Sequence, residues 1–358
     1  MPENISISDR FRGILLGTAV GDALGLPAEG MKRSRMLKRY PGRWRHRFVF
    51  DKGMLSDDTE HTLFVARSLL MHDDTAEKFI RSLAWRLRWW LLALPAGVGF
   101  ATLRAILRLW VGFSPEYSGV FSAGNGPAMR SAIIGGFFAD SPESIDAFTE
   151  SSTRITHTDE RALIGARAVA QLTGQIVRGD FKQRPSGKHF IAFLKNIGST
   201  DKEWLALVLN IEKAIKENSD VLQFAQSIGA EKGVSGYIYQ TVPVVLYAWY
   251  HHYNDFEATL TSVLNCGGDT DTTGAIAGAL AGAVSGEKAI PDDWIDNIID
   301  WPCSVNYIRE TADRLAQKKA GPDKTELLRY FWPGVPLRNL LFLMIVLSHG
   351  LRRLLPPY

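Results

Sequence analysis

A run of very small side chains between residues 272 and 285 most constrains the fold of this 358-residue chain. Its apolar residues recur at spacings of three and four, which predicts a helix from Thr272 to Ser285. Most of its positions are Gly or Ala, and each Gly inside a helix costs about 1 kcal/mol relative to Ala. Close packing at a crowded centre explains why a chain would keep such a helix. We therefore expect it in the middle of the core.

Helical spacing of apolar residues also extends over much of the remaining chain, and few segments alternate as a strand does. The helices predicted in this way are Phe11 to Leu24, Thr59 to Met71, Ala101 to Trp110, Arg161 to Val177, Ile238 to Tyr250 and Thr272 to Ser285. No linker rich in Pro, Ser or charge divides the chain, and no repeat period is visible. The sequence predicts an all-α fold with a single compact helical domain.

The C-terminal end differs in composition from the segments before it. A charged stretch, Gln317 to Lys324, precedes it, so we place the domain at residues 1–318 and an apolar C-terminal tail at residues 319–358. Its apolar core, Leu340 to Leu347, and the earlier apolar stretch Trp89 to Leu103 are both shorter than the roughly 20 residues that span a bilayer. We predict no transmembrane span. The tail either packs on the domain or contacts a membrane surface.

Several features indicate a cytoplasmic protein. Only two cysteines occur, Cys266 and Cys303, and Met1 to Phe11 lacks the apolar core of a signal peptide. The net charge is only +3, although basic residues crowd the stretch 32–47. Such a stretch is either a solvated loop or a surface that meets an anion, and we do not expect nucleic acid as the partner.

Two segments far apart in the sequence each place carboxylates at the start of a predicted helix. The first reads Ser56-Asp57-Asp58-Thr59-Glu60, and the second is Gly267 to Gly274, with Asp269 and Asp271. Each has an ordinary explanation, because helix starts favour acidic caps, and Asp57 with Glu60 has the spacing of a capping box.

A central position of the glycine-rich helix changes that interpretation. Its acidic start would then be buried, and buried charges must be paired or bind metal. Asp57, Asp58, Asp269 and Asp271 would repel one another if they met, and few basic residues are near them in sequence. A pair of divalent cations would neutralise them, and oxygen ligands select Mg²⁺, Mn²⁺ or Ca²⁺ over Zn²⁺.

Three motifs, in this order, resemble those of the ADP-ribosylglycohydrolase family. They are Gly17-Thr18-Ala19-Val20-Gly21-Asp22-Ala23-Leu24-Gly25, Ser56-Asp57-Asp58-Thr59 and Gly267-Gly268-Asp269-Thr270-Asp271-Thr272-Thr273-Gly274. The resemblance covers about Phe11 to Gly286. It implies a hydrolase that removes ADP-ribose from a modified protein side chain or a related small-molecule conjugate.

The resemblance also implies roles for individual residues. A central binuclear site with two Mg²⁺ or Mn²⁺ ions would use Ser56, Asp57, Asp58, Asp269, Asp271 and Thr272 as ligands. Glu29 matches the family glutamate that lies close to the metals and can transfer a proton, and Asp58 is the second candidate for the catalytic base.

Weaker similarities indicate how the substrate would bind. Gly97 and Gly99 precede a helix, where backbone N–H groups can hold a diphosphate. Gly124, Asn125 and Gly126 are similar to the family's ribose-contacting loop, and His157 to its histidine-bearing segment. For Glu29 and His157 the simpler alternatives are an exposed loop carboxylate and a packing histidine.

One departure from the family pattern leaves the acceptor open. Between Glu77 and Glu116 there is no Asp or Glu, whereas the bacterial dinitrogen-reductase-activating enzymes carry a functional aspartate in that region. The acceptor could be arginine, serine, a nucleic-acid end or O-acetyl-ADP-ribose. A catalytically inactive ADP-ribose-binding module and a membrane-associated regulator are the alternatives from other functional classes.

Overall fold

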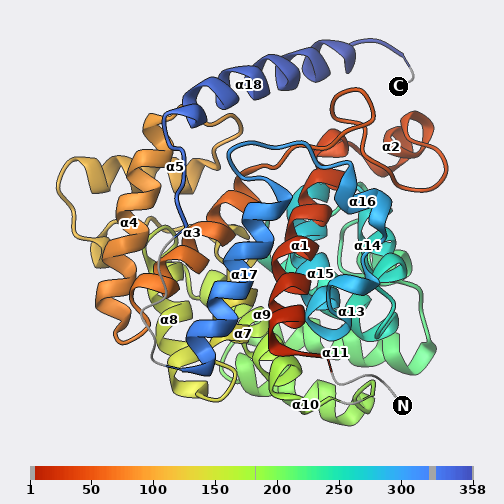
Figure 1. Ribbon diagram of the computed structural model, residues 1–358. Helices are drawn as coiled ribbons and strands as arrows, with labels where there is room; N and C mark the ends of the chain where they lie inside the picture. Colours follow the sequence, from red (N-terminus) through yellow and green to blue (C-terminus); the bar gives the residue numbers. More distant parts are fainter. Residues whose placement is uncertain (1–4, 182, 322–327, 357–358) are drawn as a thin grey trace.

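The computed structural model describes residues 5–181, 183–321 and 328–356, and in these ranges the chain folds into helices joined by short loops (Figure 1). Within them, pairing between extended segments is limited to isolated bridges. The predicted all-α fold is confirmed. The helices are α1 Ile7–Gly25, η1 Leu26–Ala28, α2 Arg33–Arg39, α3 Asp57–Met71, α4 Ala76–Leu92, α5 Phe100–Trp110, η2 Pro115–Tyr117, α6 Gly126–Met129, α7 Ala132–Phe137, α8 Pro142–Arg154, α9 Glu160–Arg178, α10 Gly187–Ile197, α11 Lys202–Glu217, α12 Val221–Ser227, α13 Ile238–His251, α14 Phe256–Leu264, α15 Thr270–Ser285, η3 Glu287–Ala289, α16 Asp292–Asp296, α17 Val305–Ala320 and α18 Gly334–Arg352.

All six helices predicted from apolar spacing are present, and their ends differ by at most a few residues. The largest extension is at the start of α1, which begins at Ile7 because Ser6 accepts a hydrogen bond from the backbone N–H of Asp9 at 3.1 Å. The alternative explanation of a capping box formed by Asp57 and Glu60 does not hold. Ser56 is the N-cap of α3, and Asp57 is already helical.

Helices α1 and α15 lie antiparallel at the centre of the molecule, with their backbones in direct contact (Figure 1). A Cβ atom placed on Gly17 would lie 2.1 Å from the carbonyl oxygen of Gly278, and one on Gly21 would lie 2.0 Å from that of Gly274. The pair of Gly13 with Gly282 is equally close. The glycine-rich helix is therefore in the core, as its composition predicts, and its partner is a second helix with glycine at every fourth residue.

Other helices surround this central pair. Helices α3 and α17 pack against α1, and α9, α13 and α14 pack against α15. One polar link fixes α17 to α1, because the guanidinium of Arg12 donates to both carboxylate oxygens of Asp313, at 2.7 and 2.6 Å. This ion pair holds α17 alongside the first half of α1.

Helix α18 lies across one end of the bundle, beside α2 (Figure 1). Its inner face packs through Phe342 against Leu26, Phe48 and Met54, while most of its leucines face outward. The division of the chain after residue 318 stays a prediction: α17 runs to Ala320, and residues 322–324 of the charged stretch lie outside the described residues.

The glycine contact gives a direct test of the fold. We expect Gly278→Ala to lower the free energy of unfolding by about 1 to 3 kcal/mol or more, because its Cβ would lie 2.0 Å from the carbonyl oxygen of Gly17. The matched control is Gly350→Ala in α18, where nothing lies within 4 Å and the better helix propensity of Ala should raise stability slightly. Urea unfolding measures both variants, and equal stabilities would contradict the close contact.

Candidate functional site

The end of α1, the start of α3 and the start of α15 meet below α18, and they carry the acidic residues singled out in the sequence. Asp22 joins the first two helices. Its Oδ2 accepts hydrogen bonds from the backbone N–H of Ser56 at 2.9 Å and from the N–H and hydroxyl of Thr59 at 3.2 and 2.5 Å. Asp22 thus fixes the segment that presents Asp57 and Asp58.

Asp58 links α3 to α15. Its Oδ2 accepts hydrogen bonds from the hydroxyls of Ser56 and Thr272, each at 3.3 Å. All three side chains are nearly excluded from solvent. Three of the six predicted metal ligands are therefore in contact with one another, although 214 residues separate Asp58 from Thr272.

Asp269 is held by a residue predicted to contact the substrate. The side-chain amide of Asn125 donates to Asp269 Oδ2 at 2.7 Å and to the hydroxyl of Thr241 at 3.0 Å. Asp269 precedes α15 but makes no capping hydrogen bond with its side chain, so the ordinary capping explanation does not apply to it.

Glu29 lies on an exposed loop that contacts the glycine pair before α15. The N–H of Gly30 donates to the carbonyl of Gly268 at 2.7 Å, and the N–H of Gly268 donates to the carbonyl of Met31 at 2.9 Å. Gly268 has a φ of 85°, and a Cβ there would lie 2.0 Å from the carbonyl oxygen of Val234, so only glycine fits. This contact places Glu29 beside the carboxylates of α15.

The electrostatics of the site disfavour bare carboxylates. Burial and then the neighbouring Asp57 and Asp22 raise the pKa of Asp58 well above its usual range. Burial, followed by Glu29 and Asp269, does the same to the pKa of Asp271. For Glu29 itself, the surrounding protein and Asp269 raise the pKa, while Arg353 opposes the shift.

One basic residue was not anticipated near this site. Arg130 is fully buried and lies close enough to Asp57 that this carboxylate favours its charged form, although burial lowers the pKa of Arg130 to about 10. Its guanidinium donates to the carbonyl of Ser152 at 2.7 Å and to the hydroxyl of Thr156 at 2.8 Å. Arg130 alone does not neutralise four carboxylates, so in the described part of the chain their negative charge is only partly compensated.

The predicted ligands suit a hard cation. Oδ1 of Asp58 and Oδ1 of Asp271 are both buried and have no hydrogen-bond partner among the described residues. Such atoms are rare in folded proteins and are satisfied by water or an ion. In the described part of the chain, however, no three His, Cys, Asp or Glu side chains converge closely enough to form a ready-made cation site. The hydroxyls of Ser56 and Thr272 would complete the oxygen ligand set.

The loops predicted to bind substrate also come together. A Cβ on Gly124 would lie 3.0 Å from Nε2 of His157, and one on Gly126 would lie 3.4 Å from Cε1 of the same ring. The buried Thr102 lies beside both Gly99 and Gly126, which joins the loop before α5 to the loop before α6. Burial, with Arg130, lowers the pKa of His157 to about 3, so the ring is neutral at pH 7.

The C-terminal helix α18 is bonded to the segment that carries the predicted metal ligands. The guanidinium of Arg338 donates to Asp300 Oδ2 at 2.6 Å and also to the carbonyl of Leu55. Arg338 lies 3.8 Å from Glu60, whose other carboxylate oxygen accepts a 2.7 Å hydrogen bond from the indole of Trp90. Glu60 is therefore buried in a structural network, and burial raises its pKa to about 7. Nothing in the spacing of the sequence indicated this network.

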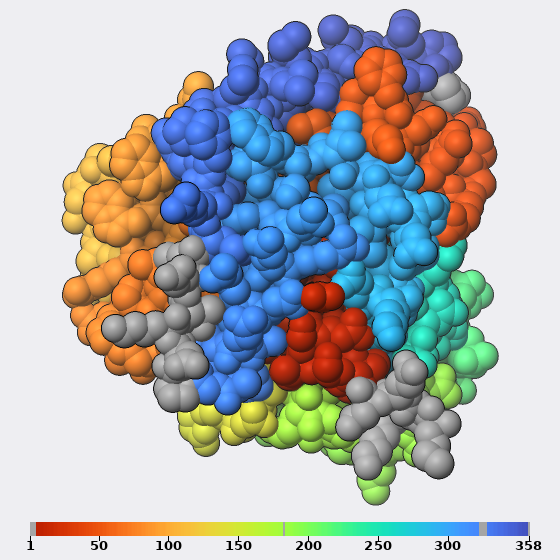
Figure 2. Space-filling model, viewed as in Figure 1, coloured from red at the N-terminus to blue at the C-terminus, as the bar shows by residue number. Residues whose placement is uncertain are grey.

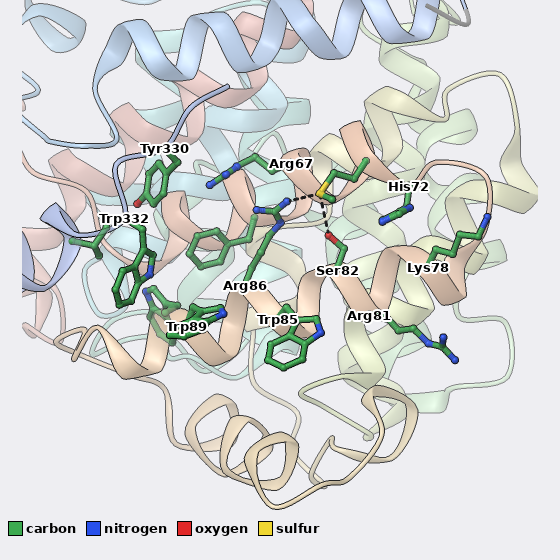
Figure 3. Close-up of a pocket in the computed structure, with 14 residues that line it drawn as sticks. Arg67, His72, Lys78, Arg81, Ser82, Trp85, Arg86, Trp89, Tyr330 and Trp332 are labelled. Carbon is green, nitrogen blue, oxygen red and sulfur yellow. Dashed lines mark hydrogen bonds between the residues drawn. The ribbon is translucent and has the colours of Figure 1, made fainter. Parts of the chain in front are cut away.

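A cavity of about 750 Å³ lies elsewhere, along α3 and α4 (Figure 3). Trp85, Trp89 and Trp332 line it together with Arg67 and Arg86. None of the predicted ligand or substrate residues lines this cavity, so its size does not make it the site of the chemistry.

The fold and the site define the class: a helical protein with buried carboxylates at the starts of two helices, α3 and α15. Comparison with known proteins identifies the family. The sequence profile of the ADP-ribosylglycohydrolase family matches residues 3–325, and the chain belongs to this family.

Relatives of the chain agree with that assignment. An uncharacterized protein of Archaeoglobus fulgidus is 32% identical over 87% of this chain and 96% of its own length. The ADP-ribosyl-[dinitrogen reductase] glycohydrolase of Rhodospirillum rubrum is 27% identical over 82% of this chain and 91% of its own. A solved structure titled "ADP-ribosylglycohydrolase-related protein complex" has 27% identity and a TM-score of 0.61, and covers 88% of this chain and 99% of that one.

The Arg338 network generates a test of how α18 supports the site. We expect Arg338→Met to lower the free energy of unfolding by about 3 to 5 kcal/mol, because it leaves Asp300 buried without a charge partner. Arg81→Met, which breaks an exposed pair with Glu77, should change little. Urea unfolding compares the two, and equal stabilities would contradict a bracing role for Arg338.

Proposed function

We propose that this chain is a metal-dependent hydrolase that removes ADP-ribose from a modified protein side chain or a related ADP-ribosyl conjugate. The observation that carries the proposal is the meeting of Asp58 and Asp271 at two helix starts, each with a buried oxygen that lacks a partner. Membership of the ADP-ribosylglycohydrolase family and the name of the Rhodospirillum rubrum relative support the substrate class.

Two Mg²⁺ or Mn²⁺ ions are the proposed cofactors, with Ser56, Asp57, Asp58, Asp269, Asp271 and Thr272 as the residues that would hold them. When bound, the cations would orient the ribose hydroxyls and stabilise the charge that develops as the glycosidic bond breaks. Asn125 and Asp22 are positioning residues in this scheme, since the first fixes Asp269 and the second fixes the start of α3.

Glu29 is the proposed proton-transfer group. Hydrolysis joins the oxygen of water to the anomeric carbon, breaks the bond to the acceptor and moves a proton from the water to the acceptor. A carboxyl whose pKa is raised holds a proton more readily near neutral pH, and the pKa of Glu29 is shifted in that direction. Asp58 is the alternative base.

The loops around Gly97, Gly99, Gly124 and Gly126 are the proposed ADP-ribose cleft. The start of α5 offers free backbone N–H groups to the diphosphate, and the neutral ring of His157 offers a hydrogen bond rather than a charge. We propose that the protein acts in the cytoplasm. A catalytically inactive binding module is the second candidate, and it would bind ADP-ribose without turnover.

A release assay on arginine-linked, serine-linked and nucleic-acid-linked ADP-ribose tests the function and identifies the acceptor. We expect release from at least one of these with Mg²⁺ or Mn²⁺, poor activity with Zn²⁺, and recovery when Mg²⁺ is restored after chelation, because the ligands are all oxygens. Full turnover in protein shown by elemental analysis to be metal-free would reject the metal site. Tight ADP-ribose binding with no release from any substrate would favour the binding module.

Asp271 and Asp22 should differ in what their substitution removes. We expect Asp271→Asn to lower both bound metal and activity, because it removes a proposed ligand. Asp22→Asn should act mainly by lowering stability, by about 1.5 to 3 kcal/mol, because its Oδ2 accepts three hydrogen bonds from the start of α3. These bonds join two helices, α1 and α3. Metal content and urea unfolding separate the variants, and equal metal content in both would count against Asp271 as a ligand.

Glu29→Gln should separate binding from turnover. We expect the variant to fold and to bind ADP-ribose normally while release slows by roughly 10² to 10⁴-fold, the usual contribution of general acid-base catalysis. Glu231→Gln, at another exposed glutamate, is the control. Calorimetry and the release assay give the two quantities. Turnover within a few-fold of the wild type would remove Glu29 from the mechanism and leave Asp58 as the base.

A further inference from the structure

Helix α18 carries an apolar stripe on the side that faces away from the domain. Its members are Leu337, Leu340, Leu341, Met344, Leu347, Leu351, Leu354 and Leu355, and each is more than half exposed. They recur at spacings of three and four, so they form one continuous face of the helix and of the turn after it. Figure 2 shows the side chains of α18 along the upper edge of the molecule. Single exposed leucines are common, but a continuous row marks an interaction surface.

The apolar surface continues beyond the helix itself. Ile299 and Trp301, about half exposed, line a hollow of about 630 Å³ together with Leu337, Leu340 and Met344. The outward face of α18 is therefore broader than one row of side chains.

Basic residues adjoin this surface, and within residues 32–47 Arg43 is ion-paired with Glu257 and Asp293. Residues 30–50 and 334–358 contain no Asp or Glu. Arg39 donates to the carbonyl of Arg352 at 3.2 Å, so the basic stretch around α2 lies against the end of α18. No described carboxylate forms an ion pair with Arg39, Arg45 or Arg352. An occupant of this surface must therefore be apolar in its interior and anionic at its edge.

The attachment of α18 sets its orientation. Among the described residues it is the one helix long and apolar enough, by length and composition, to cross a membrane. Arg338 near its start is bound to Asp300, and His349 near its end contacts the carbonyl of Phe48 at 2.7 Å. Both ends of its inner face are thus fixed to the domain, and the helix lies flat on the protein surface.

We propose that α18 docks this protein on the surface of an anionic phospholipid bilayer. The leucine stripe enters the boundary between headgroups and acyl chains, and Arg45 and Arg352, whose side chains are exposed, meet the anionic headgroups. The inference is independent of the hydrolase reaction, since it uses none of the residues assigned to the metals or to proton transfer.

Vesicle sedimentation of the full chain tests the docking. We expect binding to vesicles of phosphatidylcholine with about one third phosphatidylglycerol, and weaker binding to phosphatidylcholine alone or in 1 M salt, where charges are screened within about 3 Å. Leu341→Ser should lower the vesicle partition coefficient about tenfold, because the variant loses the free energy gained when the leucine side chain moves from water into the bilayer. Leu209→Ser on α11 is the matched control, because the two leucines are 53% and 55% exposed.

Charge and self-association are tested in the same way. Arg352→Glu should weaken binding to anionic vesicles severalfold, whereas Lys213→Glu, on α11, should not. Circular dichroism confirms that each variant is folded, and the release assay should be unchanged by Leu341→Ser. Absence of vesicle binding by the wild type, or equal binding by Leu341→Ser and Leu209→Ser, overturns the proposal. So does a dimer that Leu341→Ser converts to monomer without any vesicle binding, because the stripe would then contact a second copy.

Discussion

The backbone contact between α1 and α15 is the constraint on which the rest of the structure depends. Both helices have glycine at every fourth residue of their contact face. The backbone carbonyls of each helix therefore occupy the space that a side chain of the other helix would fill. The two helices run antiparallel, so the end of α1 lies beside the start of α15. Asp22 and Asp271 owe their proximity to this pairing and not to any local sequence signal.

That arrangement brings several carboxylates together in a buried region, where they repel one another. These carboxylates come from α3 and α15, and the buried cations near them in the described part of the chain are Arg130, close to Asp57, and Arg338, close to Glu60. Burial and mutual repulsion raise the pKa of Asp58 and Asp271, and an oxygen of each has no partner. Such an arrangement lowers stability unless something positive compensates it. A site of this kind is the cost that function imposes on the core.

The sequence predicted the helical fold and the residues that meet, but not how they are held. Apolar spacing gave the helices, and the small residues of α15 gave its central position, because both signals are local. The glycine repeat of α1 was visible but was interpreted only as part of a family motif. The acidic residues are held by distant partners. Trp90 is 30 positions from Glu60, Arg338 is 38 positions from Asp300, and Asn125 is 144 positions from Asp269. No periodicity reports such contacts, so these partners emerge only in three dimensions.

The exposed face of helix α18 depends on the buried contacts that hold the helix on the domain. Its outward stripe is apolar, which alone would make the helix a poor surface element for a protein in water. Its inward side carries Arg338 and Asn339, which bond to Asp300 and to the carbonyl of Ala93. An ordinary surface helix is apolar on its inward side and charged outward, whereas α18 is apolar on both sides, because Phe342 also packs inward against Leu26, Phe48 and Met54. The buried pair of Arg338 with Asp300 and this apolar cluster hold the inner face on the domain, and the apolar outer face is left to meet something other than water.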